Sequence, residues 1–215
     1  MPDFDNDMDI EIKERILGKA TDLFLRYGIR SITMDEIAAQ LGISKKTIYQ
    51  FFTDKDDLVD GVVGQVVAHN ETECSRFVNV AENTVHEIFI ALDEMEEMLK
   101  AMNPLIMYDL EKHHPKSFQK LKDYKYRFLY RIITRNLEAG IAAGLYRPEI
   151  NVDVVAKHRI ESAFMNFNQD VFPQNRYKMT EIGRELGMLF LHSVCTEKGK
   201  KLIEKYSKDC LKQKL

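Results

Sequence analysis

"GISKKTIYQFFTDKDDL", residues 42–58, carries the most informative local signals for the fold. It opens on glycine and serine, carries two lysines with several hydroxyl and amide side chains, and closes on acids. Ile48 and Phe52, four residues apart, share one face of a helix. Gly42 is suited to end the preceding helix and Ser44 to cap the next. The stretch therefore predicts a short helix with one narrow buried face and many polar groups pointing outward.

Two helices are expected before this one. Apolar residues recur at three- and four-residue steps between Ile12 and Tyr27, and Gly28 follows where a helix ends. "TMDE" (33–36) matches a capping box, in which the Thr33 side chain and the Glu36 side chain each bond the other's backbone amide. Three short helices, with a tight turn at "LGIS" (41–44), describe a helix-turn-helix.

The whole chain has the composition of a soluble globular protein. It has 215 residues, 45% hydrophobic and 30% charged, and a net charge of -3. That charge argues against a generally basic nucleic-acid coat protein but leaves room for a local basic patch. Three cysteines without a CxxC pair indicate reduced thiols and a cytoplasmic location. We expect no signal peptide, and no apolar stretch approaches the roughly 20 residues that span a membrane.

Beyond residue 58 the pattern is helical throughout, and no pair of segments reads as strands. The expected helices lie near 54–80, 84–101, 104–113, 116–143, 151–170, 178–196 and 198–212. The fold class predicted is all-α, with an N-terminal three-helix helix-turn-helix domain followed by a larger helical domain. We expect a disordered acidic N-terminus at 1–9, the helix-turn-helix at 10–55 and the larger domain at 56–215.

The outward side chains of the opening stretch suit a DNA groove. Lysines neutralise phosphates and release counterions. Hydroxyl groups of Thr47 and Tyr49 can fix the register on the backbone, and Gln50 can read a base edge. Lys55, at the start of the next helix, can hold a phosphate from the far side. The alternative is a solvated helical face with Tyr49 half-buried, and the residues alone leave both open.

Residues 10–58 resemble the DNA-binding domain of the TetR family of bacterial transcriptional regulators. The matching features are "LFLRYG" (23–28), Thr33, "IA" (37–38), "LGIS" (41–44), "TIYQFF" (47–52) and "KDDL" (55–58). The resemblance implies a phosphate contact from Thr33 and a reading role for Lys45, Lys46 and Gln50. The full set of predicted DNA-binding residues is Thr33, Ser44, Lys45, Lys46, Thr47, Tyr49, Gln50 and Lys55.

Residues 151–170 and 178–196 are apolar on most sides of a helix. A core helix and a subunit interface explain this equally well from sequence. The resemblance favours a homodimer, in which two long C-terminal helices pair with their copies. Such a dimer would offer two reading helices about 34–36 Å apart to a palindromic double-stranded operator. The predicted interface residues are Phe164, Phe167, Met188, Leu191, His192 and Cys195.

Methionines and aromatic residues gather on the helices between these regions. They adapt to irregular ligands, although core packing is the more frequent use of any one of them. The resemblance implies an effector pocket for a small molecule, and this composition favours a hydrophobic or amphipathic one. The predicted pocket residues are Phe89, Leu92, Met95, Leu99, Met107, Tyr108, Tyr124, Phe128 and Ile132.

The chain shows no pattern for catalysis, a cofactor or a metal. His113 and His114 are adjacent, so their side chains diverge, and no HxxxH spacing occurs. We therefore predict a non-enzymatic DNA-binding regulator, by resemblance a repressor released by its effector, with activation still open. One alternative is an all-α ligand-binding protein or enzyme whose N-terminal helices only pack. A second is a helical interaction protein without a ligand.

Overall fold

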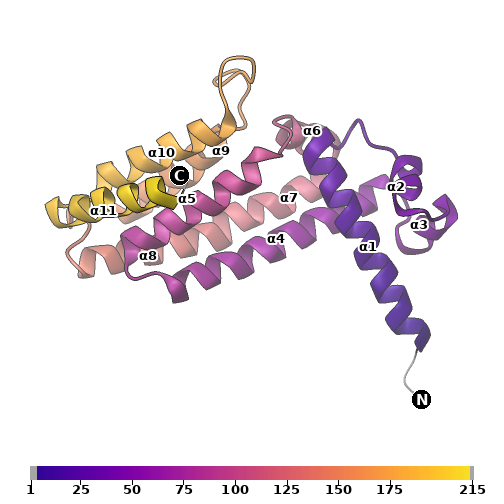
Figure 1. Ribbon diagram of the computed structural model, residues 1–215, viewed down its shortest axis with the longest axis horizontal. Helices are drawn as coiled ribbons and strands as arrows, with labels where there is room; N and C mark the ends of the chain where they lie inside the picture. Colours follow the sequence, from indigo (N-terminus) through magenta and orange to yellow (C-terminus); the bar gives the residue numbers. More distant parts are fainter. Residues whose placement is uncertain (1–3, 214–215) are drawn as a thin grey trace. The chain divides into compact units, whose positions relative to one another are not determined.

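Most of the described residues are helical in the computed structural model, which describes the backbone of residues 4–213 and the side chains of residues 8–209 (Figure 1). Within those limits there is no strand, and Tyr146 and Cys195 form one isolated antiparallel bridge. The all-α prediction is confirmed.

The helices follow one another in the order that the apolar periodicity predicted. Their bounds are α1 Phe4–Tyr27, α2 Met34–Leu41, α3 Lys45–Phe51, α4 Lys55–Val80, α5 Thr84–Lys100, α6 Ile106–His113, α7 Pro115–Asp123, a π-helical segment η1 Tyr124–Leu129, α8 Tyr130–Ala142, α9 Val152–Met165, α10 Met179–Val194 and α11 Glu197–Gln213.

Three segments differ from the expected pattern. The expected single helix at 116–143 contains the π-helical turn η1, and α9 ends at Met165 although helix was expected to residue 170. The first helix begins at Phe4, inside the segment 1–9 for which we expected disorder, and residues 1–3 lie outside the described part. The spacing of apolar residues indicates the buried face of a helix but not its exact end or its hydrogen-bond register.

The chain forms two compact units. The first consists of residues 1–70 and 101–122, and the second of residues 71–100 and 123–215. The helix-turn-helix lies wholly in the first unit. That unit also takes in the first part of α4 together with α6 and most of α7, which the sequence had assigned to the larger domain. Helix α4 runs from one unit into the next.

The first unit has its own apolar core. Ile16 and Phe24 of α1, Ile37 of α2, Ile48 of α3 and Leu58 of α4 are each almost fully buried in it. Each of these helices therefore contributes its apolar stripe to one common centre, which fixes the polar faces of α2 and α3 on the outside.

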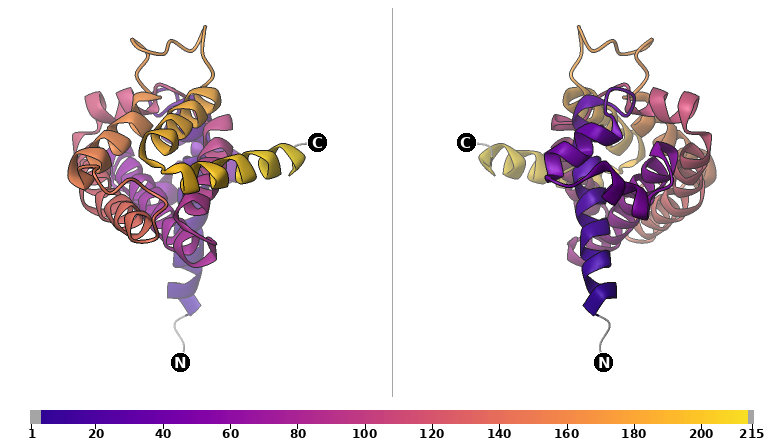
Figure 2. Two further views of the ribbon diagram at one scale, coloured as in Figure 1. Left: turned by 90° about the vertical axis from the view of Figure 1, so that its left-hand side faces the viewer. Right: turned by 90° about the vertical axis from the view of Figure 1, so that its right-hand side faces the viewer.

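The second unit is a helical bundle with a separate core. Phe89 and Leu92 of α5 meet Leu137 of α8 and Leu191 of α10 there. Helix α10 packs against α5 and α9, and α9 packs against α8. Residues 166–178, which join α9 to α10, form an irregular loop that projects beyond the ends of those two helices (orange, Figure 2).

Candidate nucleic-acid interface

Residues within and just before helix α3 fix its start and its buried face. Gly42 adopts the left-handed conformation at φ 66°, which a residue with a side chain rarely takes, and so reverses the chain within one residue. The Ser44 hydroxyl then accepts a hydrogen bond from the Thr47 amide at 3.1 Å. Ile48 is fully buried and holds the short helix on the core. These caps and this anchor are the ones that the sequence predicted.

The opposite face of α3 is open to solvent. Lys45, Lys46 and Gln50 are exposed, and Tyr49 is 44% exposed despite its aromatic ring. Thr47 is half-buried, with its hydroxyl 2.8 Å from that of Ser44. The helix therefore presents two cations, a phenol and an amide side by side, and these are groups that bind phosphates and base edges.

Lys45 is held in place by a neighbouring helix. Its ammonium lies 2.8 Å from the Asp35 carboxylate of α2 and 6.0 Å from the centre of the Tyr49 ring. The hydrogen bond to Asp35 raises the pKa of Lys45, so the side chain stays charged. Both partners are exposed, so the pair contributes little to stability and a phosphate can compete for the lysine.

Thr33 begins α2 as predicted. Its hydroxyl accepts a hydrogen bond from the Glu36 amide at 3.2 Å, and the Glu36 carboxylate accepts from the Thr33 amide at 2.7 Å. The Thr33 hydroxyl also donates to Glu36 at 2.9 Å. The capping box is confirmed. The phosphate contact implied for Thr33 stays a prediction, and it would require the hydroxyl to leave Glu36.

Lys55 does not face outward as the sequence suggested. Its ammonium donates a hydrogen bond to the backbone oxygen of Ile29 at 2.6 Å and lies over the Phe24 ring. Burial lowers its pKa, although nearby Asp109 and Asp56 act in the opposite direction. This cation already binds a carbonyl of its own unit, which argues against the predicted phosphate contact of Lys55.

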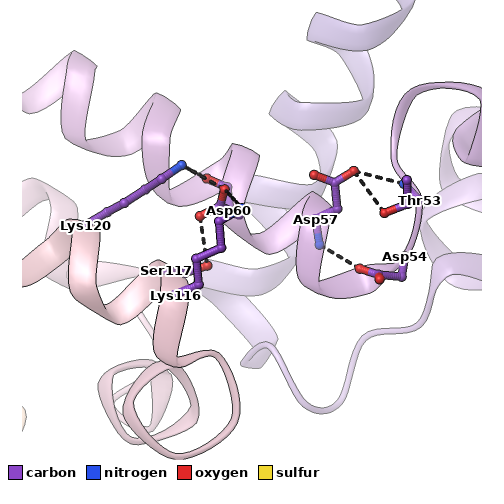
Figure 3. Close-up of polar contacts among 7 residues, drawn as sticks. All are labelled: Thr53, Asp54, Asp57, Asp60, Lys116, Ser117 and Lys120. Atoms are coloured by element: carbon purple, nitrogen blue, oxygen red, sulfur yellow. Dashed lines mark hydrogen bonds and ion pairs between the residues drawn. The ribbon is translucent and has the colours of Figure 1, made fainter.

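Polar contacts hold the first turns of α4 (Figure 3). Asp54 accepts a hydrogen bond from the Asp57 amide at 2.8 Å, and Asp57 accepts from the Thr53 amide at 2.9 Å. One turn further, Asp60 lies 3.0 Å from Lys116 and 2.9 Å from Lys120 of α7. The two lysines follow Asp60 by 56 and 60 residues in sequence, so no local pattern points to them.

The Asp60 carboxylate is largely buried, whereas the two lysines that pair with it are exposed. Burial acts to raise the pKa of Asp60, but hydrogen bonds from Lys120 and Lys116 outweigh it and hold the pKa below its ordinary value. Nearby, Nδ1 of the buried His114 lies 2.8 Å from Asp56. The start of α4, which follows α3 directly, is thus tied to α7 within the first unit.

The predicted pocket residues belong to both units. Seven of them lie in the second unit, and Phe89, Leu92, Leu99 and Tyr124 are buried there. Met107 and Tyr108 belong to the first unit. Met107 packs on the core of that unit, and Tyr108 is exposed with its hydroxyl bonded to Lys112. These two belong to the first unit because α6 does.

The predicted interface residues also divide. Leu191 and Cys195 are buried in the core of the second unit, so their side chains are already covered within the chain. Phe164, Phe167 and Met188 are half-buried, and His192 is exposed. The sequence missed Leu189, which is the most exposed large apolar side chain of α10. An apolar residue among apolar residues gives no sign of which side of the helix it occupies.

The described residues contain neither a membrane-spanning helix nor a metal-binding cluster. None of the helices described is long and apolar enough to cross a membrane. Among the side chains placed between residues 8 and 209, no group of three histidine, cysteine or acidic residues could hold a metal ion.

A short capped helix, anchored by one residue after a left-handed glycine turn and polar on its outer face, defines a helix-turn-helix protein. Residues 16–62 match the family model described as bacterial regulatory proteins, tetR family. This match covers the helix-turn-helix segment, about a fifth of the chain, and over that segment the chain is similar to the TetR family.

Relatives and solved structures agree with this assignment. The uncharacterized HTH-type transcriptional regulator YvaF of Bacillus subtilis is 31% identical over 102 residues, which are 47% of this chain and 53% of YvaF, so the match spans about half of that relative. A putative transcriptional regulator from Saccharomonospora viridis, in complex with choline, matches with a TM-score of 0.69 and 18% identity over 87% of this chain and 99% of its own. FadR from Bacillus subtilis, in complex with stearoyl-CoA, matches with a TM-score of 0.64 and 15% identity over 82% and 96%. At these identities the two structures show the fold alone.

Proposed function

We propose that the chain is a cytoplasmic DNA-binding transcription regulator whose helix α3 enters the major groove. The observation that carries this is the outer face of α3, where Lys45, Lys46 and Gln50 are exposed beside Tyr49 while Ile48 anchors the helix beneath. A face of this kind supplies phosphate contacts and base readout from one short helix. The match of residues 16–62 to the tetR family model supports the same assignment.

The regulator acts as a homodimer on a palindromic operator in this proposal. Leu189 is 58% exposed on α10, His192 lies on the same face, and Met188 beside them is half-buried. An outward leucine on a long helix supports coverage by a second copy of the chain. Two copies related by a twofold axis would offer two α3 helices to successive major grooves, about 34–36 Å apart.

A small hydrophobic or amphipathic effector would release the DNA, which makes the protein a repressor. The complexes of related folds with choline and with stearoyl-CoA support a ligand site in proteins of this architecture. Release requires that the effector bind the DNA-free form more tightly than the DNA-bound form, because a ligand shifts an equilibrium only through such a difference.

Two matched lysine variants test the DNA interface. We expect Lys45→Met to weaken binding to DNA from the region upstream of the gene that encodes the protein. The plot of log affinity against log salt concentration should become less steep by about 0.9, the value for one phosphate contact. Lys55→Met removes the same charge from a side chain bonded to Ile29, so it should leave the slope unchanged. Fluorescence anisotropy over a salt series measures both.

The opposite pattern would count against the proposal. An unchanged slope in Lys45→Met would show that α3 does not lie on the phosphates, and wild-type protein without salt-dependent affinity would favour the ligand-binding or enzymatic alternative. Sedimentation of the wild type in the same buffer reports its oligomeric state, and a monomer at micromolar concentration would contradict the homodimer.

A further inference from the structure

Arg159 is a charged side chain that points into the second unit. It is 8% exposed on α9, and its Nη1 atom is buried without a hydrogen-bond partner. Burial lowers the pKa of Arg159 to about 10, and burial is the whole cause of the shift, since no described acid offsets it. The guanidinium therefore keeps its positive charge at neutral pH in surroundings that do not neutralise it.

The contact that Arg159 does make cannot replace a counterion. Its guanidinium lies 5.3 Å from the centre of the Phe190 ring on α10. The face of an aromatic ring attracts a cation, but more weakly than a carboxylate does in a dry interior. Leaving a buried charge unpaired costs far more than such a contact returns.

Asn166 adds a second buried polar group without a partner. It is 1% exposed, and neither its amide nitrogen nor its amide oxygen forms a hydrogen bond. It follows Arg159 by seven residues, which is two helical turns, so the two share one side of α9 and its C-terminal turn. Nε2 of Gln169, three residues later, is also buried and unbonded. Three of these four unbonded atoms are hydrogen-bond donors, which suits an acceptor such as an anion.

The opposing helices supply an apolar wall. A Cβ added at Gly183 of α10 would stand 2.8 Å from the Met95 side chain and 3.5 Å from Asn166 Nδ2, and one added at Gly187 would collide with Leu92. Asn166 therefore faces the Gly183 end of α10, and Arg159 faces Phe190 seven residues further on. Donors on α9 and at its C-cap thus lie opposite aliphatic and aromatic side chains of α5 and α10.

The other partly buried arginines of this unit have acidic partners. Arg184 of α10 lies 2.9 Å from Asp93 and 3.3 Å from Glu96, and Arg135 pairs with Glu87. Arg159 is thus distinguished by its lack of an acid, not by its burial alone. No side chain between residues 8 and 209 supplies that acid, so pairing the charge calls for an anion from elsewhere.

We propose that Arg159 binds the carboxylate of a small organic acid, that Asn166 bonds a polar group of the same molecule, and that the rest of the molecule is apolar. A guanidinium binds a carboxylate through two parallel hydrogen bonds, and methionine, leucine and phenylalanine side chains accommodate an apolar body. This inference rests on the proposed function, since it names the chemical class of the effector.

Thermal unfolding of the full-length protein tests the site. The probes are straight-chain carboxylates from butanoate to decanoate, each beside the neutral amide of the same length. We expect one or more carboxylates to raise the Tm of the wild type, by about 5 °C near saturation, and the matched amides to leave it unchanged. Arg159→Met should abolish the shift while its own Tm, without ligand, equals or exceeds that of the wild type, because it removes an unpaired buried charge.

Arg184→Met is the matched control on a neighbouring helix. It should lower the Tm, because it leaves Asp93 and Glu96 without this cation, and it should keep the response to carboxylates. The proposal is overturned if no carboxylate in the series stabilises the wild type more than it stabilises Arg159→Met. It is also overturned if Arg159→Met lowers the Tm as much as Arg184→Met does, since Arg159 would then be paired within the chain.

DNA binding separates this inference from the proposed function. Wild type and Arg159→Met should bind the operator equally without ligand, and only the wild type should be released by the stabilising carboxylate. If both bind DNA but no carboxylate acts, the anion site fails and the regulator stands. If neither binds DNA in a salt-dependent way, the regulator itself fails.

Discussion

The outer face of α3 and the inner face of α9 both carry cations and amides, but in opposite surroundings. On α3, Lys45 and Gln50 are exposed, and Lys45 has an acid beside it. Arg159 on α9 and Asn166 at its C-cap are buried and have atoms without a hydrogen-bond partner. Water and salt can satisfy the first set in the free protein, whereas the second set depends on whatever enters the interior.

The difference in burial indicates which kind of ligand each set of groups suits. An exposed lysine gains little from its neighbour and exchanges it readily for a phosphate, so α3 suits a ligand that is large, anionic and outside the protein. A buried arginine without an acid costs stability until an anion arrives, so α9 suits a small ligand that becomes part of the interior. Burial, more than residue type, separates the two.

The largest effect tests how α3 is held beneath its polar face. Ile48→Ala should lower the free energy of unfolding by about 3 kcal/mol, because it opens a cavity under the helix at a fully buried position. Tyr49→Ala, one residue further and 44% exposed, should change it by only about 0.5 kcal/mol. Urea unfolding followed by circular dichroism gives both values. Equal losses in the two variants would mean that Tyr49 is buried as well.

A pair of buried asparagines tests whether the α9 amide truly has no partner. Asn136 is 2% exposed and is bonded at both ends of its amide, since it donates to the Thr84 carbonyl at 3.1 Å and accepts from the Tyr146 hydroxyl at 3.1 Å. We expect Asn136→Ala to cost about 2 kcal/mol more than Asn166→Ala, because only the first breaks hydrogen bonds. Chemical unfolding of both variants without ligand measures the difference, and similar losses would show that Asn166 is bonded within the protein.

The smallest effect comes from Asp60, which is buried like Arg159 but has partners. Because Lys120 and Lys116 hold its pKa low, the ionised form stabilises the fold above about pH 4, and this contribution is lost as the pH falls through the lowered pKa. Asp60→Asn should therefore cost about 1 kcal/mol at pH 7, and the cost should shrink below pH 4. Unfolding midpoints of both proteins at pH 7 and pH 3 check this, and a cost independent of pH would remove the charge from the explanation.

Much of the first unit was predictable, because its signals are local. The capping box at Thr33 and Glu36, the turn at Gly42 and the anchor at Ile48 each depend on residues a few positions apart, and all occur as predicted. The direction of Lys55 was not predictable, because its partner is the carbonyl of Ile29, 26 residues earlier.

The second unit shows the limit of periodicity more clearly. The apolar stripes predicted α5, α8, α9 and α10, but not which apolar residues face the core. Leu191 was expected at a subunit interface and is buried within the chain, whereas Leu189 is exposed. When a helix is apolar on most sides, its sequence does not indicate which side faces the core.

By itself the sequence determined the helical class, the caps and turn that shape the helix-turn-helix, and the polar face of α3, since these follow from spacing and backbone preference over a few residues. Tertiary structure alone decided that Lys55 turns inward, that Asp60 meets two lysines of α7, and that Arg159 is buried without an acid. The physical reason is that burial and charge pairing depend on which distant segments pack together. That choice is made by the sum of many weak contacts across the core, so no short stretch of residues records it.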